Sequence, residues 1–397
     1  MNSKTTLTEK QLVLILAALS ALTPLAIDMY LPALNSMEAI FNETNARLSI
    51  SISVYFLGLA FGQLFGGPIS DAYGRYPMII VGLLIFCLTN LFIIFTTDIK
   101  MLWFARFVQA FGGGIAAVNI AATVRDMFSG KDSARIFSLI GSITILAPLL
   151  APAFGLGIMS IFDNYRVIFV VLLLYSIGVL FFYKKYFKNI KKQNKSRITP
   201  IKNYINVLTN KKPMLMILAL VISSSGLYCV ITSSSFIYTN HFKLSSFWFV
   251  LCFSLNITMM LIAVKINLRF VKFRSPLKLL KFGMLSQLFL GIILLLINKT
   301  TNIYLFAPIL ALYVSTQGFI FGNAVSLILD KFPQISASAN AVIGSLQYGV
   351  GSFSGFLSSH LNDETLFPIA LILVSSSFIG VVILFISTGI KNEFSSN

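Results

Sequence analysis

Acidic residues are the scarcest charged residues in this sequence, and charge of either sign is rare. The 397 residues include 13 Asp and Glu against 30 Lys and Arg, and charged residues make up 11% of the chain, whereas soluble domains carry about 25%. Hydrophobic residues make up 57%, above the roughly 45–50% of soluble domains. A water-soluble core cannot bury so much apolar surface, so the composition predicts a membrane protein.

The alternation of polar and apolar residues that marks a membrane β-barrel is also missing. The apolar residues, among them 37 Phe, form long uninterrupted runs instead. A helix needs about 20 largely apolar residues to cross roughly 30 Å of hydrocarbon. Twelve runs of this kind are centred near residues 22, 57, 87, 113, 146, 174, 225, 256, 287, 315, 348 and 378. The sequence therefore predicts an all-α integral membrane protein with twelve transmembrane helices.

Side-chain clusters that could hold a metal ion or carry out catalysis are absent from the sequence pattern. The three cysteines lie far apart in apolar runs, and the two histidines stand alone in short polar loops: Cys87, Cys229, Cys252, His241 and His360. This spacing fits neither a disulfide framework nor a metal site. Paired carboxylates and nucleophile arrangements are missing as well. We expect no cofactor, no metal and no enzyme activity.

The segment from residue 184 to residue 212 contains no acidic residue but ten Lys and Arg. A net charge of +17 can indicate nucleic-acid binding. Here, however, the basic residues lie between apolar runs, as in loops held on the cytoplasmic side of a membrane. We expect no nucleic-acid partner and both chain termini in the cytoplasm. The first apolar run lacks a small-x-small cleavage site, so it is predicted to be a retained helix.

The long polar break also divides the apolar runs into two groups of six. We predict an N-terminal six-helix half at residues 1–183, a basic cytoplasmic linker at 184–213 and a C-terminal six-helix half at 214–397. Two such halves are typical of a transporter built from related repeats around a central cavity. A channel is the structural alternative, but no filter-like loop recurs in the sequence.

Only one acidic residue, Asp28, lies inside a predicted span. An ionised carboxylate is costly there and is normally kept only facing a cavity or a partner. Asp28 is therefore predicted to exchange protons during function; the alternative is a solvated cap at the outer end of its helix. Arg106, in the fourth span, cannot release its proton but can modulate a nearby carboxylate. Its alternative role is snorkelling toward the interface.

Five segments of the first half resemble known transporter motifs. Between the second and third spans, the spacing Gly67-x-x-x-Asp71-x-x-Gly74-Arg75 resembles the signature loop of the major facilitator superfamily. Four more segments resemble the bicyclomycin-resistance (Bcr/CflA) family of drug:proton antiporters, and they follow one another in the order found in that family: DMYLPA at 28–33, RFVQAFG at 106–112, RDMF at 125–128 and APLLAPAFG at 147–155. The second half matches mainly by its number of spans and by SASA at 336–339 and GSLQ at 344–347.

The resemblance implies an alternating-access exporter of the bacterial inner membrane, with Arg106 beside the proton route. It also implies a conformational latch on the cytoplasmic side formed by Gly67, Asp71, Gly74 and Arg75. The antiporter motif would be Pro148, Pro152, Gly155 and Gly157, for which an ordinary kinked helix is the alternative. The chain departs from the family at Ala72 and Tyr76, where bases are usual, and this weakens the expected latch.

Polar and aromatic residues inside the predicted spans outline a candidate substrate cavity: Tyr30, Tyr55, Gln63, Asn119, Tyr228, Asn256, Gln287, Gln317, Asn323 and Gln347. For any single member of this set, however, an interhelical hydrogen bond is the favoured role. The spans offer no second acid to neutralise a cationic drug while Asp28 carries the proton. We therefore predict neutral, zwitterionic or anionic substrates, such as amphenicol-like or bicyclomycin-like compounds. The alternative is a dedicated exporter of a metabolite such as a siderophore, amino acid or sugar.

The expected partners are the transported small molecule, protons and the lipid bilayer, and the chain is expected to act as a monomer.

Overall fold

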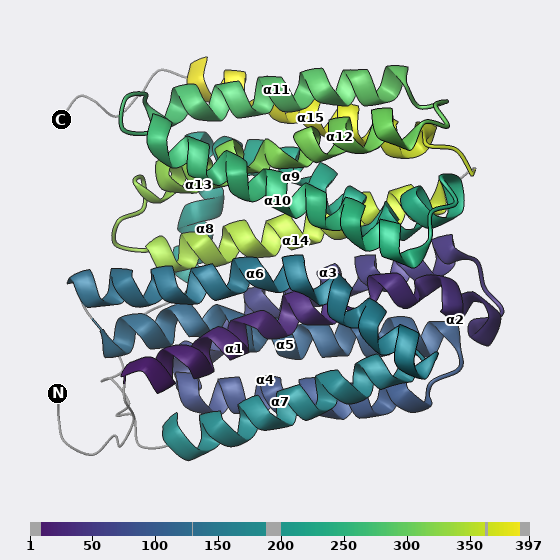
Figure 1. The fold of residues 1–397 in the computed structure, drawn as a ribbon. Helices are drawn as coiled ribbons and strands as arrows, with labels where there is room; N and C mark the ends of the chain where they lie inside the picture. The colour runs from purple at the N-terminus through teal and green to yellow at the C-terminus, as the bar shows by residue number, and fades with distance from the viewer. Residues whose placement is uncertain (1–8, 129, 188–199, 362–363, 390–397) are drawn as a thin grey trace. The chain divides into compact units, whose positions relative to one another are not determined.

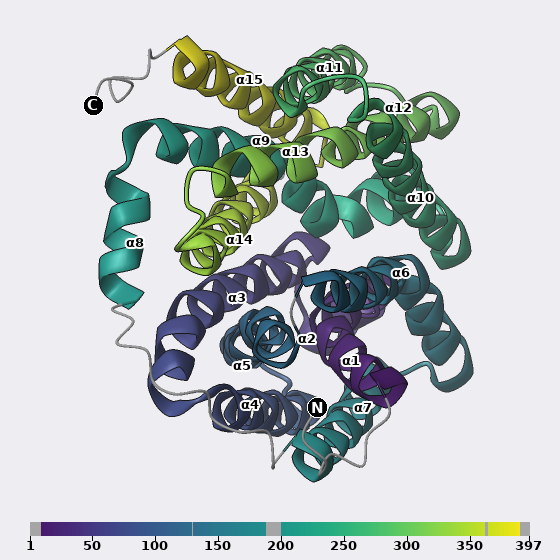
Figure 2. The same cartoon turned by 90° about the vertical axis from the view of Figure 1, so that its left-hand side faces the viewer.

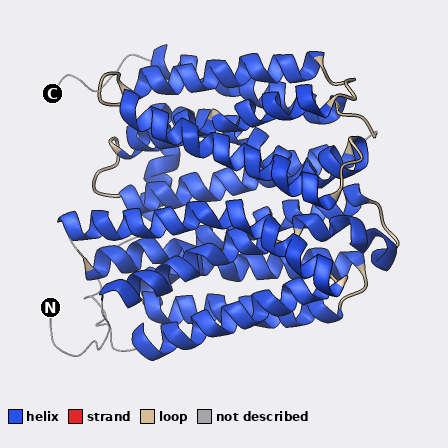
Figure 3. Cartoon of the chain, in the orientation of Figure 1, coloured by secondary structure: helices blue, strands red, loops and turns tan. Residues whose placement is uncertain are grey.

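Every regular element in the described part of the chain is a helix. The computed structural model describes residues 9–128, 130–187, 200–361 and 364–389 (Figures 1 and 3). Helices form from the long apolar runs because a chain in lipid must satisfy its backbone hydrogen bonds within the same segment. The predicted all-α fold is confirmed.

Contacts divide the chain into two units. The first comprises Met1–Pro200 with Leu244–Ser254, and the second comprises Ile201–Lys243 with Leu255–Asn397. The boundary between them cuts one helix after Ser254, near its first third. The boundaries predicted at residues 183 and 213 stay predictions, and residues 188–199 of the predicted linker lie outside the described residues.

Helix α5 occupies the middle of the first unit and packs against α3 and α4 (Figures 1 and 2). Glycines permit the close approach, since a Cβ added at Gly112 of α5 would lie 2.6 Å from the Gly82 carbonyl oxygen of α4. The elements of this unit are α1 Glu9–Asp28, η1 Leu31–Ala33, α2 Leu34–Phe41, α3 Asn45–Tyr73, α4 Arg75–Phe95, α5 Ile99–Met127, α6 Gly130–Phe162 and α7 Arg166–Phe187.

Helix α9 has the corresponding role in the second unit and packs against α14 and α15. It continues into a π-helical segment, η2. The elements from α8 onward are α8 Pro200–Thr209, α9 Lys211–Ser235, η2 Phe236–His241, α10 Ser246–Phe270, α11 Pro276–Leu296, α12 Ile303–Ser315, α13 Gln317–Leu329, α14 Ser336–His360 and α15 Phe367–Gly389.

Eleven helical segments among the described residues are long and apolar enough to cross a membrane. The twelfth predicted span is α14, which has the necessary length at 25 residues but is too rich in Ser and Gly to qualify by composition. Its polar groups are satisfied inside the second unit: Ser354 donates to the Ser225 carbonyl at 2.8 Å, and Ser358 bonds Ser233 at 2.9 Å. A helix shielded in this way does not need an apolar surface on every side.

Candidate functional site

Asp28 is the last residue of α1, and the chain turns immediately after it. Pro32 in η1 explains the break, because proline has no N–H group to donate to the carbonyl of Asp28, four residues earlier, and its ring clashes with that carbonyl. Asp28 is 4% exposed, so it does not cap the helix from solvent. Among the described residues, no hydrogen bond or ion pair involves its carboxyl group. The acid selected from the sequence is thus buried, and its role in proton coupling stays a prediction.

Arg106 lies in an aromatic cage inside the first unit. Its guanidinium carbon is 4.2 Å from the centre of the Tyr55 ring, 4.8 Å from that of Tyr30 and 5.9 Å from that of Phe169. Cation–π attraction is strongest when the cation is desolvated, and Arg106 is 0% exposed. The Tyr30 hydroxyl is tied to Ser51 at 3.0 Å. Arg106 therefore does not snorkel to the interface but is held between α3, α7 and the turn that follows α1.

A chain of amides positions this guanidinium. Arg106 Nη1 donates to Gln109 Oε1 at 2.7 Å, and Gln109 Nε2 donates to Asn90 Oδ1 at 2.8 Å. Asn90 of α4 is anchored in turn to the Phe86 carbonyl at 2.8 Å. The sequence prediction did not select Asn90 or Gln109 as site residues. Gln109 could have been found, since it follows Arg106 by three residues and so shares its face of the helix.

The positive charge of Arg106 has no acidic counterpart among the described residues. None of the ion pairs among the described residues joins it to Asp28. Its Nε and Nη2 groups are buried without a hydrogen-bond acceptor. A buried charged donor without an acceptor is unfavourable by about 1–3 kcal/mol or more, so these two groups are available to a further acceptor.

Removing the anchor of the amide chain is expected to destabilise the first unit. An Asn90→Leu variant keeps the side-chain volume but leaves the Gln109 amide without its acceptor, which lowers the free energy of unfolding by about 1–3 kcal/mol. Thermal unfolding of the detergent-solubilised protein measures this. Thr89→Val is the matched control, because Thr89 bonds only the carbonyls of its own helix and is expected to change stability by less than about 0.5 kcal/mol. Equal melting of the two variants would contradict the structural role of Asn90.

Helix α6 meets the turn that follows Asp28. It runs unbroken through Pro148 and Pro152, so neither proline divides the helix. At Gly155, an added Cβ would overlap the Met29 carbonyl oxygen, whereas at Gly157 no atom lies within 4 Å. Of the two glycines in the predicted antiporter motif, only Gly155 therefore contacts the Asp28 turn.

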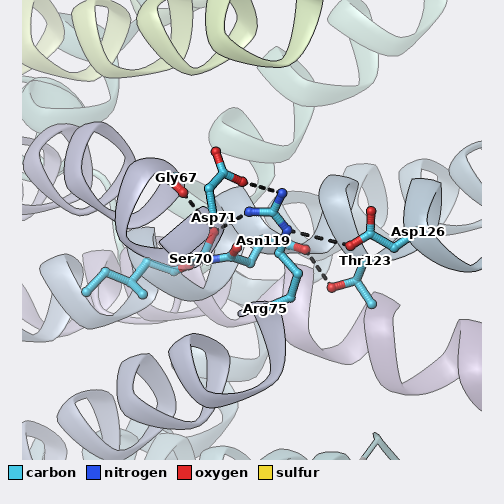
Figure 4. A network of polar contacts seen from close by, with 8 residues as sticks. Gly67, Ser70, Asp71, Arg75, Asn119, Thr123 and Asp126 are labelled. Atoms are coloured by element: carbon cyan, nitrogen blue, oxygen red, sulfur yellow. Dashed lines mark hydrogen bonds and ion pairs between the residues drawn. The ribbon is translucent and has the colours of Figure 1, made fainter. Parts of the chain in front are cut away.

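A second polar cluster lies where α3, α4 and α5 meet (Figure 4). Gly74 joins α3 to α4 with φ 102°, a conformation that favours glycine. The next residue, Arg75, pairs with Asp71 and donates to Ser70, whose hydroxyl donates to the Gly67 carbonyl at 2.8 Å. The structure thus brings the four predicted latch residues together, and their role as a latch stays a prediction.

Asp126 of α5 joins the same cluster, with its Oδ2 3.7 Å from Arg75 Nε. The sequence prediction placed residues 125–128 in a family motif but assigned Asp126 no role. The signal in the sequence was an acidic residue at the end of an apolar helix. The sequence did not reveal its partner, because Arg75 lies on another helix. Asn119 and Thr123 lie beside it on α5 (Figure 4). Residues 106 and 126 are roughly 30 Å apart along that helix at 1.5 Å per residue, so α5 carries members of both sites.

The predicted cavity residues of the first unit do not all lie at one site. Tyr30 and Tyr55 form the Arg106 cage, whereas Asn119 lies near Arg75 (Figure 4) and donates to its own helix at Ile115. Gln63 is half-buried on α3. The structure thus supports a shared site for the two tyrosines only.

In the second unit, two of the predicted cavity residues hold helices together. Gln287 accepts from the Ser223 hydroxyl at 2.5 Å and donates to the Ser223 carbonyl at 3.2 Å. Asn323 donates to Asn267 at 2.8 Å. These are the interhelical hydrogen bonds that were the alternative for every member of the set.

The other predicted residues of this unit are buried with less complete bonding. Gln317 accepts from Ser224 at 3.1 Å, but its Nε2 has no acceptor. Asn256 donates to Tyr238 at 3.1 Å, and its Oδ1 has no donor. Tyr228 packs edge-on against Tyr348, and Gln347 is 9% exposed. Gln317 and Asn256 therefore keep polar groups available for a ligand.

Long apolar helices, a buried acid and a glycine turn braced by Arg75 are features of a multi-pass membrane transporter. The sequence profile of the Major Facilitator Superfamily matches residues 16–356, and the chain belongs to this family of transporters, which are not enzymes.

Relatives and solved structures agree with this family. The chain is 29% identical to a bicyclomycin resistance protein homolog of Haemophilus influenzae, with 90% of each chain covered, and 27% identical to multidrug resistance protein D of Escherichia coli, with 88% of this chain and 87% of the relative covered. The xylose transporter XylE of E. coli has the same fold, with a TM-score of 0.73 at 13% identity over 98% of this chain and 99% of that one.

Proposed function

We propose that this chain is a proton-coupled exporter of the Bcr/CflA type that removes small toxic molecules, including antibiotics, from the cell by alternating access. Support comes from relatives named for bicyclomycin and multidrug resistance and from the motifs shared with drug:proton antiporters. The latch role of Asp71 and Arg75 and the sealing role of the α6 motif belong to this proposal.

The observation that carries the proposal is the unpaired, buried Asp28. An ionised carboxylate without a partner is costly in an apolar interior, whereas a neutral acid is tolerated. Any rearrangement that changes the water or the charges around Asp28 therefore changes its affinity for a proton. Arg106 has a fixed positive charge and two unused donor groups, so a change in its distance from Asp28 would couple helix movement to proton release.

The same pair of residues supports the proposed substrate class. Arg106 brings an uncompensated positive charge into the first unit, and Asp28 is the only acid among the buried residues that the structure describes. A cationic drug would meet repulsion from Arg106 and would compete with the proton for Asp28. Neutral, zwitterionic and anionic compounds avoid both conflicts, and the unused amides of Gln317 and Asn256 offer them hydrogen bonds.

The proposed location is the bacterial inner membrane, with both termini in the cytoplasm and the chain acting as a monomer. The basic residues between 184 and 212 support this orientation, since Lys and Arg are retained on the cytoplasmic side.

Everted membrane vesicles test the function. Respiration acidifies the vesicle interior, so an antiporter exchanges internal protons for external drug. We expect a neutral amphenicol to accumulate against its gradient, to raise the internal pH when it is added, and to be released by a protonophore. Vesicles from cells without the protein are the control. Accumulation that ignores the protonophore, or strong transport of a quaternary ammonium cation with none of the amphenicol, would refute the proposal.

A further inference from the structure

An apolar groove of about 470 Å³ runs between α1 and α7 on the surface of the first unit. The two helices lie side by side and antiparallel (Figures 1 and 2). Both belong to segments that are long and apolar enough to cross a membrane. The groove is lined by residues that include Leu14, Ile15, Ala18, Leu174, Gly178 and Phe182.

The shape of the groove comes from small residues in its floor and large ones in its walls. Gly178 faces open space, because a Cβ added there would have no atom within 4 Å. Leu14 and Leu174 are 63% and 64% exposed, so they stand up as opposite walls. Tyr175 crosses the floor and donates to the Ala18 carbonyl at 2.8 Å. This hydrogen bond satisfies the phenol, so the floor offers a ligand little beyond apolar contact.

One end of the groove is basic and aromatic. Phe182 and Tyr186 stack with their rings parallel, and Lys185 lies over the Tyr186 ring at 5.1 Å. Lys184 and Lys185 form the last turn of α7 and are exposed. No acid pairs with either lysine among the described residues. Aromatic residues beside Lys at a helix end are typical of the membrane–water interface.

We propose that this groove binds one phospholipid with an anionic head group, whose acyl chain lies between α1 and α7 and whose phosphate is held by Lys184 and Lys185. The charge of the lipid head group determines which lipid we expect in the groove. Lipid chains fill an apolar groove in a bilayer without a net hydrophobic gain, so the chain alone gives no preference. Each Lys near the surface favours an anionic lipid. Lys185 supplies such a charge at this end of the groove, because it lies over the ring of the lining residue Tyr186, and Lys184 precedes it in the same helical turn.

Photocrosslinking on the full chain tests the site. The probe is phosphatidylglycerol with a photoreactive acyl chain, and the comparison is phosphatidylcholine with the same chain. We expect phosphatidylglycerol to label the peptides around residues 11–18 and 174–186 about tenfold more strongly, in line with the attraction of two lysines for an anionic head group. Lys184→Gln together with Lys185→Gln is expected to remove this difference.

A variant that fills the groove provides a second test in the same crosslinking experiment. Gly178→Leu places a side chain in the open space and is expected to reduce labelling by phosphatidylglycerol at least tenfold. Gly141→Leu is the matched control, because Gly141 of α6 also has no atom within 4 Å of an added Cβ, and it should label like the wild type. Equal labelling by the two lipids, or labelling unchanged in Gly178→Leu, would overturn the proposal.

Discussion

An Asp28→Asn variant is expected to insert and fold like the wild type and to lose proton-driven export entirely. Asparagine has nearly the same shape as aspartate but cannot exchange a proton. Because no described residue bonds the Asp28 carboxyl, the substitution breaks no hydrogen bond or ion pair, and stability should change by less than about 1 kcal/mol. In everted vesicles, drug accumulation should fall to the level of vesicles without the protein.

Two comparisons separate a coupling defect from general damage. Asp28→Asn should still exchange labelled for unlabelled drug across the membrane without a pH gradient, because that exchange needs no proton release. Asp28→Glu keeps a carboxyl group and should retain part of the proton-driven export, although the extra methylene has to be accommodated in a buried site. Uphill export that survives in Asp28→Asn would transfer the coupling role to another group.

A Gly155→Ala variant is expected to lose most export and to unfold at a lower temperature. The added methyl group would overlap the Met29 carbonyl oxygen, which belongs to backbone and cannot rotate away. Either α6 or the turn after Asp28 has to move, and overpacking of this kind usually costs about 1–3 kcal/mol. Because the turn also carries Tyr30 of the Arg106 cage, the displacement should disturb the surroundings of both Asp28 and Arg106.

Gly157→Ala is the matched control two residues along the same helix. It adds the same methyl group where no atom lies within 4 Å, and alanine favours a helix over glycine by up to about 1 kcal/mol. We expect it to melt at the wild-type temperature or higher and to keep far more export than Gly155→Ala. Thermal unfolding in detergent and drug accumulation in vesicles measure both effects. Similar losses in the two variants would show that general flexibility of α6, and not its contact with Met29, is what matters.

The polar residues in the spans show where prediction from sequence stops. Ten were predicted to outline a cavity, and Tyr30 and Tyr55 do face the same guanidinium. Gln287 and Asn323 instead pair with Ser223 and Asn267. A polar residue in an apolar run shows only that a partner is needed in lipid. Whether that partner is a helix or a ligand depends on how the helix is rotated against its neighbours.

The Gly74 turn was selected through its resemblance to a transporter motif. By itself, the sequence determined the helical membrane fold and the choice of Asp28 and Arg106. These follow from local causes: long apolar runs must become helices in lipid, and charges inside such runs are too costly to be incidental. Tertiary structure alone decided the partners. Asn90 behind Gln109, Asp126 beside Arg75 and Gly155 against Met29 join residues on different helices, because contacts between helices depend on packing rotation and crossing, which sequence spacing within one helix does not specify.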